Sequence, residues 1–306
     1  MAGQYDIAVI GGGIAGLTAA NHALQGDCSV AHIIGTEPIG GLVCNVGELS
    51  GYPAGDQPLS GIGQAIALSA ANAELGAVEM MADATSVSAL GSGFRIDTNE
   101  GEIISRNIIA ATGARLRMLD VPGAHDLIGR GVSQCAWCDG ALYKGKNVVV
   151  VGGGDAALEE ALHLANIAAK VTVITRGAGF RARRSYVTRI ANIATVDSRW
   201  MCDVVEIIGG ETVEAVRVHD RKNGAVEEIA CDGAFVFIGI EANSGLLEGL
   251  AEFDERAAVV TDERMQTATP GIYAIGALRS GYRGRLVHAV GEAATAAMEA
   301  VTSCGE

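Results

Sequence analysis

Two stretches of the chain share one pattern of apolar and polar positions. In residues 5–37 an apolar run is followed by three glycines, an alanine-rich run and a second apolar run. Residues 146–177 repeat this order. Short apolar runs bounded by glycine indicate buried strands, and the longer alanine-rich runs indicate helices. The pattern therefore predicts two strand–helix–strand units, each with a glycine turn before its helix.

Further elements follow from the same patterning. One apolar strand leads into Ala-Thr-Gly-Ala at 111–114, a second lies within 233–243, and a short third strand closes on Gly276. A helix is predicted over 286–301.

The order of these elements predicts an α/β fold with two Rossmann-like nucleotide-binding domains, the second inserted into the first. The first domain is expected over residues 1–115 and 245–306, and the inserted domain over 116–244. The short connections near 115 and 245 would act as a two-strand hinge.

Each glycine turn matches the dinucleotide-binding pattern G-x-G-x-x-G/A. Glycine permits the tight turn and lets the backbone approach a pyrophosphate, which sits at the positive end of the helix. Two copies, each between a strand and a helix, are a stronger signal than one. The residues assigned to nucleotide binding are Gly11, Gly13, Ile14, Ala15 and Gly16 in the first turn, and Gly152, Gly154, Asp155, Ala156 and Ala157 in the second.

The two units end in opposite charges. Glu37 follows the second strand of the first unit, where a carboxylate can accept hydrogen bonds from a ribose diol. The second unit has Arg176 there, followed by Arg181 and two further arginines. Cations at this point suit the 2′-phosphate of NADP, and a solvated basic face is the alternative.

Composition and charge narrow the classes of protein. Hydrophobic residues make up 49% of the 306 residues, which indicates a globular chain, and the net charge of −14 argues against a nucleic-acid partner. No apolar run reaches the roughly 18 residues of a membrane span, and the N-terminus lacks the basic start of a signal peptide. The odd number of 7 scattered cysteines suits the reducing cytoplasm.

Cys135 and Cys138 form a Cys-x-x-Cys pair just before the second glycine turn. A zinc site would need a second close pair of ligands, but the other cysteines and the 6 histidines are scattered, so no metal is expected. Two buried free thiols are a second alternative. A redox dithiol is favoured because this spacing can close a small disulfide, and a following helix N-terminus would stabilise a thiolate. Asp139 would be either a proton donor for a leaving thiolate or a helix cap.

Two other residues have less specific interpretations. Trp137, between the cysteines, would form an apolar lip for a docking protein or shield the disulfide. Cys304, near the end of the chain, is expected to be an exposed terminal thiol.

Together these motifs resemble the low-molecular-weight thioredoxin reductases. CAWCDG stands between the paired nucleotide motifs, and GGGIAG, GG at 40–41, ATGA, GGGDAALEEAL, GFRA and TPGIYAIG follow the order and spacing of that family. The resemblance covers nearly the whole chain. It implies a homodimer with the pyridine-nucleotide disulfide oxidoreductase fold, with FAD in the first domain and NADPH in the inserted one.

The resemblance also implies roles for individual residues. Cys138 would be the thiol nearest the flavin, Cys135 would attack the disulfide of a partner protein, and Asp139 would handle the proton. Electrons would pass from NADPH to FAD, to the cysteine pair, and on to thioredoxin or a similar small dithiol protein. One domain would swivel, because the flavin cannot meet the nicotinamide and the cysteine pair at once. Further residues implied at the flavin are Gly40, Gly41, Leu42, Thr112, Gly113, Gly276, Ala277, Arg285 and His288.

The chain departs from the family pattern around the flavin. Leu42 replaces the glutamine of the family's GGQ, Gly51 replaces an asparagine, and Ala277 replaces the aspartate of its GD. The family's RQ before the last helix reads RGRLVHA, which would bring Arg285 or His288 towards the flavin.

A further departure lies in the second domain, where the family's His-Arg-Arg reads Thr175-Arg176-Gly177 and leaves fewer cations for a 2′-phosphate. The leading hypothesis is still an NADPH-dependent reductase of a thioredoxin-like disulfide. One alternative is a thiol oxidase that passes electrons from a dithiol to oxygen, with His288 as its base. Another is a reductase with a different donor, such as reduced ferredoxin. A flavoprotein that binds a partner without turnover is the third, and the intact cysteine pair argues against it.

Overall fold

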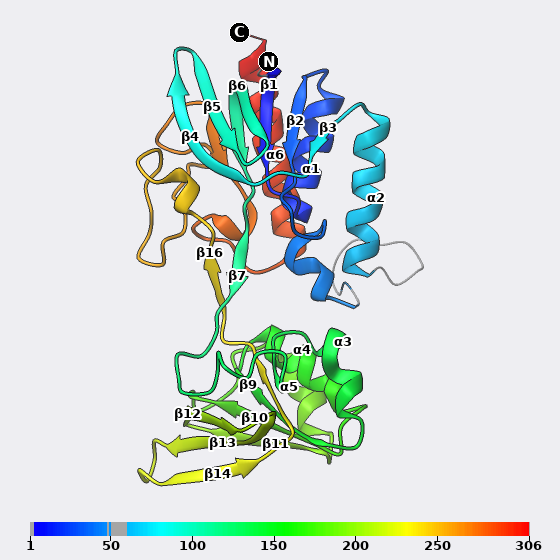
Figure 1. Ribbon diagram of the computed structural model, residues 1–306, viewed down its shortest axis with the longest axis vertical. Helices are drawn as coiled ribbons and strands as arrows, with labels where there is room; N and C mark the ends of the chain where they lie inside the picture. Colours follow the sequence, from blue (N-terminus) through cyan, green and yellow to red (C-terminus); the bar gives the residue numbers. More distant parts are fainter. Residues whose placement is uncertain (1–2, 48, 50–59, 306) are drawn as a thin grey trace. The chain divides into compact units, whose positions relative to one another are not determined.

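The computed structural model describes residues 3–47, 49 and 60–305, so Gly51 lies outside the described residues. The contacts divide the chain into two compact units (Figure 1). The first comprises Met1–Arg115 and Glu241–Glu306, and the second comprises Leu116–Ile240.

The chain returns to the first unit at Glu241, earlier than the expected position 245. The two connections, β7 (Ala114–Leu116) and β16 (Ile240–Ala242), pair with each other as a two-stranded sheet. Directly after this pairing, the Asn243 N–H donates to the Gly113 carbonyl oxygen at 3.0 Å. These hydrogen bonds attach residues 241–244 to the first unit, which explains the earlier boundary.

The first unit is built on a seven-stranded sheet with the order β3-β2-β1-β6-β5-β4, in which β17 also pairs with β6. Strands β1, β2, β3, β6 and β17 are parallel, while β4 and β5 join as antiparallel neighbours. The strands are β1 (Gly3–Ile10), β2 (Val30–Ile33), β3 (Val78–Met80), β4 (Ala84–Leu90), β5 (Gly93–Thr98), β6 (Gly101–Ala110) and β17 (Ile272–Ala274).

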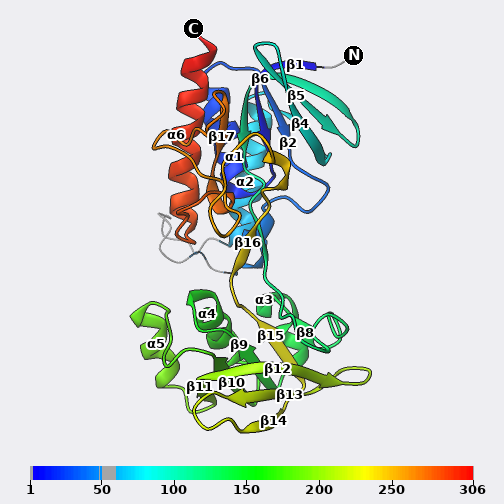
Figure 2. The same ribbon diagram turned by 90° about the vertical axis from the view of Figure 1, so that its left-hand side faces the viewer.

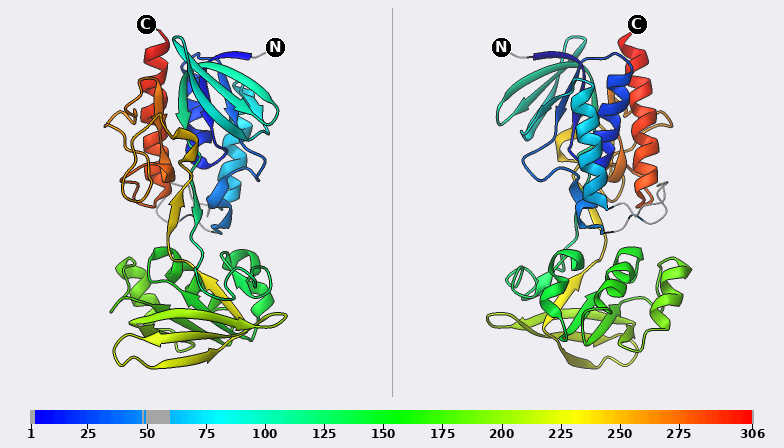
Figure 3. Two further views of the ribbon diagram at one scale, coloured as in Figure 1. Left: turned by 60° about the vertical axis from the view of Figure 1, so that its left-hand side comes forward. Right: turned by 90° about the vertical axis from the view of Figure 1, so that its right-hand side faces the viewer.

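Helices α1 (Ile14–Gln25), α2 (Gly61–Glu74) and α6 (Leu286–Cys304) lie side by side in this unit (Figure 3). Ala19 of α1 and Ala293 of α6 share a buried core with Val9 of β1. Small side chains at these positions let both helices approach the sheet and each other closely. The described part of this unit also contains the short 3₁₀ helices η1 (Gly41–Asn45), η3 (Gly245–Leu247) and η4 (Gly276–Leu278).

The second unit has three layers (Figure 2). Its central sheet is parallel, with the order β11-β10-β9-β15-β8. Val148 and Val150 of β9 pack in one core with helix α4, whereas Val149 and Val151 pack in another with an antiparallel sheet of β12, β13 and β14. Successive side chains of a strand point to opposite faces, so a strand buried on both faces is apolar throughout.

The elements of the second unit have these bounds. Its strands are β8 (Val132–Ser133), β9 (Asn147–Val151), β10 (Lys170–Thr175), β11 (Val196–Trp200), β12 (Cys202–Gly209), β13 (Val213–Asp220), β14 (Val226–Ala230) and β15 (Gly233–Val236). Its helices are α3 (Ala136–Asp139), η2 (Gly140–Tyr143), α4 (Asp155–Leu164) and α5 (Arg184–Ala191).

The predicted α/β fold class is confirmed. The two predicted strand–helix–strand units are β1-α1-β2 and β9-α4-β10, and the helix predicted over 286–301 is α6, which extends to Cys304. Within the described residues, no helix is long and apolar enough to cross a membrane.

Candidate active site

The glycine turn between β1 and α1 is closed by backbone contacts that exclude side chains. A Cβ atom at Gly11 would lie 2.2 Å from the Ala111 carbonyl oxygen, and one at Gly16 would lie 1.9 Å from the Gly11 carbonyl oxygen. Gly11 also has a φ of +126°, which side-chain-bearing residues rarely adopt. Only glycine fits this close turn.

The start of α1 has room for an anion such as the pyrophosphate of a dinucleotide. Gly13 is the N-cap, it provides no side-chain cap, and the first turn carries no acid. The nearest described atom to a Cβ built at Gly13 is the Gly40 carbonyl oxygen, 3.8 Å away. The first amide N–H groups of the helix can therefore bind an anion in the positive field of the helix N-terminus.

Predicted residues from three segments meet at this turn. The Gly40 N–H donates to the Gly12 carbonyl oxygen at 2.8 Å, and Gly40 forms a bridge with Gly13. A Cβ at Gly276 would lie 3.1 Å from the Cβ of Ala15, so the segment after β17 also borders the turn. Leu42 is 38% exposed in η1, and Glu37 is exposed in the segment after β2.

Two hydrogen bonds between Thr112 and Asn243 join the two chain segments that connect the units. The Thr112 hydroxyl donates to the Asn243 carbonyl oxygen at 2.7 Å, and the Asn243 side-chain amide donates to the Thr112 carbonyl oxygen at 3.0 Å. The sequence pattern did not single out Asn243. Its position at the end of the apolar run 233–243, directly after β16, is the signal that marks it.

Arg285 and His288 lie at the start of α6, where Arg285 is the exposed N-cap residue. His288 lines a pocket of about 310 Å³. Glu292, in the same pocket, accepts hydrogen bonds from the Gly276 N–H at 2.7 Å and from Arg279 at 2.6 Å. The Glu292 carboxylate, which the motifs did not reveal, therefore positions the backbone just before Ala277.

A buried histidine supports the first glycine turn. His32 of β2 is fully buried, and its Nε2 lies 3.0 Å from the Gly11 carbonyl oxygen. This contact requires the proton on Nε2, because a carbonyl oxygen only accepts. His32 Nδ1 is buried without a hydrogen-bond partner among the described atoms, and burial lowers the pKa of the ring. A histidine inside the apolar run that forms β2 was the only sequence signal.

We expect His32 to make the folded state acid-sensitive. Below pH 6.5, the ordinary pKa of histidine, His32 takes up a proton in the unfolded chain but not in the folded chain. The free energy of unfolding therefore keeps the full contribution of His32 above this pH and loses it as the pH falls below it. The loss is up to about 1.4 kcal/mol for each pH unit. Urea unfolding of the wild type and of His32→Leu between pH 5 and 8 measures it. Parallel stability curves for the two proteins would contradict this prediction.

The second glycine turn has the same construction. A Cβ at Gly152 would lie 2.2 Å from the Phe237 carbonyl oxygen, while no described atom lies within 4 Å of a Cβ built at Gly154. Asp155, the first residue of α4, pairs with Arg183: its carboxylate lies 2.8 Å from Arg183 Nε and accepts the Arg183 N–H at 2.7 Å. Arg183 thereby offsets a negative charge that would oppose a pyrophosphate at this helix N-terminus.

The loop after β10 returns to this turn. The Arg181 N–H donates to the Gly153 carbonyl oxygen at 2.7 Å, and Phe180 packs on Trp200 with ring centroids 4.2 Å apart. Arg176, which directly follows β10, and Arg181 are both exposed. The backbone of the loop that carries both arginines therefore borders the second glycine turn.

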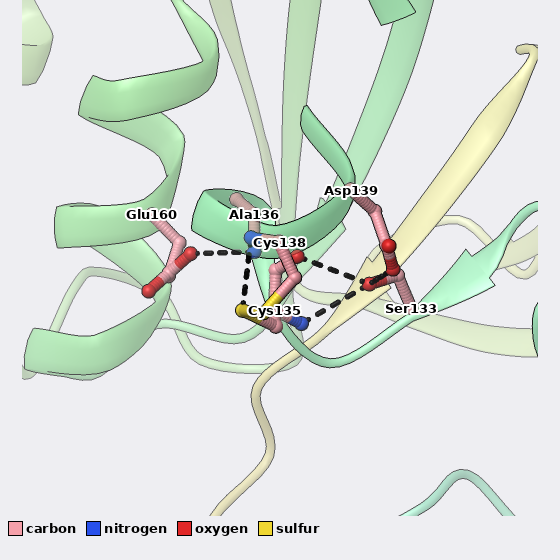
Figure 4. The surroundings of a disulfide bond; sticks show 6 residues. All are labelled: Ser133, Cys135, Ala136, Cys138, Asp139 and Glu160. Atoms are coloured by element: carbon pink, nitrogen blue, oxygen red, sulfur yellow. Dashed lines mark hydrogen bonds between the residues drawn. A yellow bond between two sulfur atoms is a disulfide. The ribbon is translucent and has the colours of Figure 1, made fainter. Parts of the chain in front are cut away.

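Cys135 and Cys138 are joined by a disulfide (Figure 4), so the alternative of two free thiols is wrong. Cys135 precedes α3 as its N-cap and is 8% exposed, while Cys138 within α3 is exposed. The Cys138 N–H donates to the Cys135 sulfur at 3.0 Å. That bond would stabilise a thiolate on Cys135 after reduction of the disulfide.

Asp139 is held in place by Ser133, which also contacts the backbone of Cys135 (Figure 4). The Ser133 hydroxyl donates to an Asp139 carboxylate oxygen at 2.6 Å, and the Cys135 N–H donates to the Ser133 oxygen at 3.1 Å. The Asp139 side chain makes no capping hydrogen bond, since Cys135 caps α3 instead. The helix-cap alternative for Asp139 is therefore wrong, and Ser133 is a site residue that the sequence pattern missed.

Glu160 of α4 reaches the same turn. This residue is only 8% exposed, and its Oε2 accepts the Ala136 N–H at 2.8 Å. Its carboxylate also accepts a backbone hydrogen bond from Trp137. Burial raises the pKa of the Glu160 carboxyl to about 7.

Trp137 lies between the two cysteines, and its expected role as a docking lip or as a shield of the disulfide stays a prediction. Its ring stacks on His163 with centroids 3.8 Å apart, yet its side chain remains 46% exposed next to the disulfide.

Cys304 is half-buried, and the Asn107 side-chain amide lies 3.3 Å from its sulfur. The expectation that Cys304 is an exposed thiol is wrong. Among the residues that the structure describes, no cluster of three metal-ligating side chains occurs.

Two strand–helix–strand units with dinucleotide-type glycine turns, together with a disulfide on the second unit, define a nucleotide-dependent disulfide oxidoreductase. The chain belongs to the pyridine nucleotide-disulphide oxidoreductase family, whose model matches residues 5–300. Enzymes of this class use a flavin and a pyridine nucleotide, and the two glycine turns fit these groups.

Individual relatives are similar over nearly their whole length. The thioredoxin reductase of Treponema pallidum is 34% identical, with 98% of this chain and 97% of the relative aligned. That of Listeria innocua is 37% identical, with 97% and 92% aligned. The crystal structure of Lactococcus lactis thioredoxin reductase superposes with a TM-score of 0.94 at 32% identity, covering 98% of this chain and 99% of that one. The expected resemblance to the low-molecular-weight thioredoxin reductases is confirmed.

Proposed function

We propose that this oxidoreductase passes electrons from NADPH, through FAD, to the Cys135–Cys138 disulfide and then to the disulfide of a thioredoxin-like protein. The observation that carries the proposal is the disulfide itself, with its sulfur in contact with an amide N–H and with the carboxylate of the next residue, Asp139, bound to Ser133. The thioredoxin reductases among its relatives support this substrate class.

The two glycine turns would hold the two nucleotides. Gly11, Gly13 and Gly16 would bind the FAD pyrophosphate, and Glu37 would accept from its ribose. The Gly152–Gly154 turn would bind the NADPH pyrophosphate, with Arg176 and Arg181 at the 2′-phosphate. When bound, the flavin supplies two-electron transfer between a nicotinamide and a disulfide.

The cysteine pair would reduce the partner by two exchanges. The Cys135 thiolate attacks the partner's disulfide, which forms a mixed disulfide and releases one partner thiolate. Cys138 then attacks the Cys135 sulfur, which restores the Cys135–Cys138 disulfide and releases the second partner thiolate. Asp139, oriented by Ser133, would hold the proton that a leaving thiolate needs.

The family resemblance also supports a homodimer in the cytoplasm. The scattered, odd number of cysteines suits a reducing compartment. Light scattering of the purified protein tests the dimer, which would have twice the chain mass of 31.3 kDa.

We expect a preference for NADPH over NADH that depends on Arg176. A charge-assisted contact contributes about 1.5–3 kcal/mol, so Arg176→Ala should lower the NADPH-to-NADH ratio of kcat/KM by about tenfold or more. The preference should be moderate, because Gly177 replaces one cation of the family pattern. Arg189→Ala, a change at an exposed arginine in the last turn of α5, is the matched control and should leave the ratio unchanged.

An anaerobic titration with NADPH, followed by flavin absorbance, tests the donor directly. Bleaching by NADPH supports the proposal. A preference for NADH, or no bleaching by either nucleotide, would contradict it and favour another donor such as reduced ferredoxin.

A further inference from the structure

Residues 135–138, which carry the disulfide, are called the redox turn here. Its backbone N–H groups donate hydrogen bonds to a sulfur and to a carboxylate. The Cys138 N–H donates to the Cys135 sulfur, whereas the Ala136 N–H donates to Oε2 of Glu160, 24 residues away in the chain (Figure 4). Glu160 also accepts from the Trp137 backbone. The first N–H groups of a helix have no partners inside it, so the carboxylate and the sulfur bind to free N–H donors of one short turn.

Reduction of the disulfide changes the charge at this turn. The disulfide is neutral, but the reduced pair carries a thiolate whenever one thiol loses its proton. An ionised Glu160 carboxylate bound to the same turn repels that thiolate. The carboxylate also occupies N–H groups that would otherwise stabilise the thiolate. Because Glu160 is 8% exposed, solvent screens this repulsion only weakly.

We propose that Glu160 is a positioning residue that sets the reduction potential of the Cys135–Cys138 pair by holding a negative charge against the amides of the redox turn. Its charge disfavours the reduced pair and so makes the pair a stronger electron donor to a partner's disulfide. This inference deepens the proposed function and rests on it for the direction of electron flow.

The test measures the equilibrium of the pair alone, without NADPH or a partner protein. The full-length flavoprotein is equilibrated at pH 8 with mixtures of reduced and oxidised dithiothreitol. At this pH Glu160 is ionised, since its pKa is about 7. The thiols are then trapped by alkylation, and mass spectrometry gives the reduced fraction of the peptide that carries both cysteines. Each reduction consumes one dithiothreitol dithiol and forms one cyclic disulfide, so electrons balance.

We expect Glu160→Gln, which removes the charge and keeps the size, to shift the equilibrium three- to tenfold towards the dithiol. Tenfold corresponds to about 30 mV for this two-electron couple. Glu160→Asp keeps the charge and should stay within twofold of the wild type, whereas a packing role would make this shortened side chain the more disruptive change. Glu159→Gln is the matched control, because Glu159 is the next acid on α4 but hydrogen-bonds with Tyr186.

Three results would overturn the inference: a shift below twofold for Glu160→Gln, a shift towards the disulfide, or an equal shift for Glu159→Gln. A wild-type pair that stays oxidised at every dithiothreitol ratio would instead contradict the proposed function, so the two failures are distinguishable. Unchanged flavin absorbance and far-UV circular dichroism show that each variant is folded.

Discussion

Replacing Cys138 with serine should reduce NADPH-dependent reduction of a thioredoxin-like disulfide by about 10³-fold or more, the scale expected when a covalent catalyst is removed. The variant cannot form the disulfide that Cys135 and Cys138 make in the structure, so it has no internal electron acceptor. NADPH oxidation in the presence of the partner protein measures the effect. Cys304→Ser, a change to a half-buried thiol of the first unit, is the control and should keep wild-type activity. Activity above one hundredth of the wild type in Cys138→Ser would contradict the role of the pair.

The lone thiols left by Cys138→Ser and Cys135→Ser also test which sulfur attacks the partner. The remaining Cys135 should displace thionitrobenzoate from a partner protein activated at a single cysteine faster than the remaining Cys138. The reason is that the Cys138 N–H stabilises the thiolate of Cys135. Faster release by Cys138, which is the exposed member of the pair, would reverse the assigned order.

The second large effect is expected at Asp139. Asp139→Asn keeps the size of the side chain and its acceptor for the Ser133 hydroxyl but removes the proton that a leaving thiolate needs. We expect disulfide reduction to slow by about 10- to 10⁴-fold, the usual span for general acid–base catalysis. Ser133→Ala should have a smaller effect in the same direction, because it frees the carboxylate without removing it. Flavin content should be unchanged in both variants.

Asp139 also separates the reductase from the oxidase alternative. If electrons instead flowed from a dithiol to oxygen, His288→Ala would be the damaging change, and Asp139→Asn would have little effect. Oxygen consumption driven by dithiothreitol measures this activity. A wild type that oxidises dithiols with oxygen faster than it reduces a thioredoxin-like disulfide with NADPH would contradict the reductase assignment.

Some parts of the site follow from short stretches of the sequence. The turn from Gly11 to Gly16 is such a case. A Cβ at either glycine would clash with a backbone carbonyl oxygen, that of Ala111 after β6 or that of Gly11 within the turn. The Cys135–Cys138 disulfide is another, because two cysteines at this spacing are brought together by a single turn of chain. The apolar runs that became β1 and β9 predicted buried strands for the same reason: burial on both faces leaves no position for polar residues.

Other parts were decided only by the packing of distant segments. From the sequence, Asp139 could be a proton donor or a helix cap. In the structure the Cys135 sulfur caps α3, and the Asp139 carboxylate accepts a hydrogen bond from Ser133. Glu160 looks like an ordinary acid of an amphipathic helix, and it meets the redox turn only because α4 packs against α3. The residue types within a short stretch are set by the turn or strand that the stretch forms, so they can be recognised in the sequence. Contacts between elements depend on how helices and sheets pack in three dimensions. That is why the sequence by itself determined the nucleotide turns and the disulfide, and only the tertiary structure decided which carboxylate, hydroxyl and imidazole surround them.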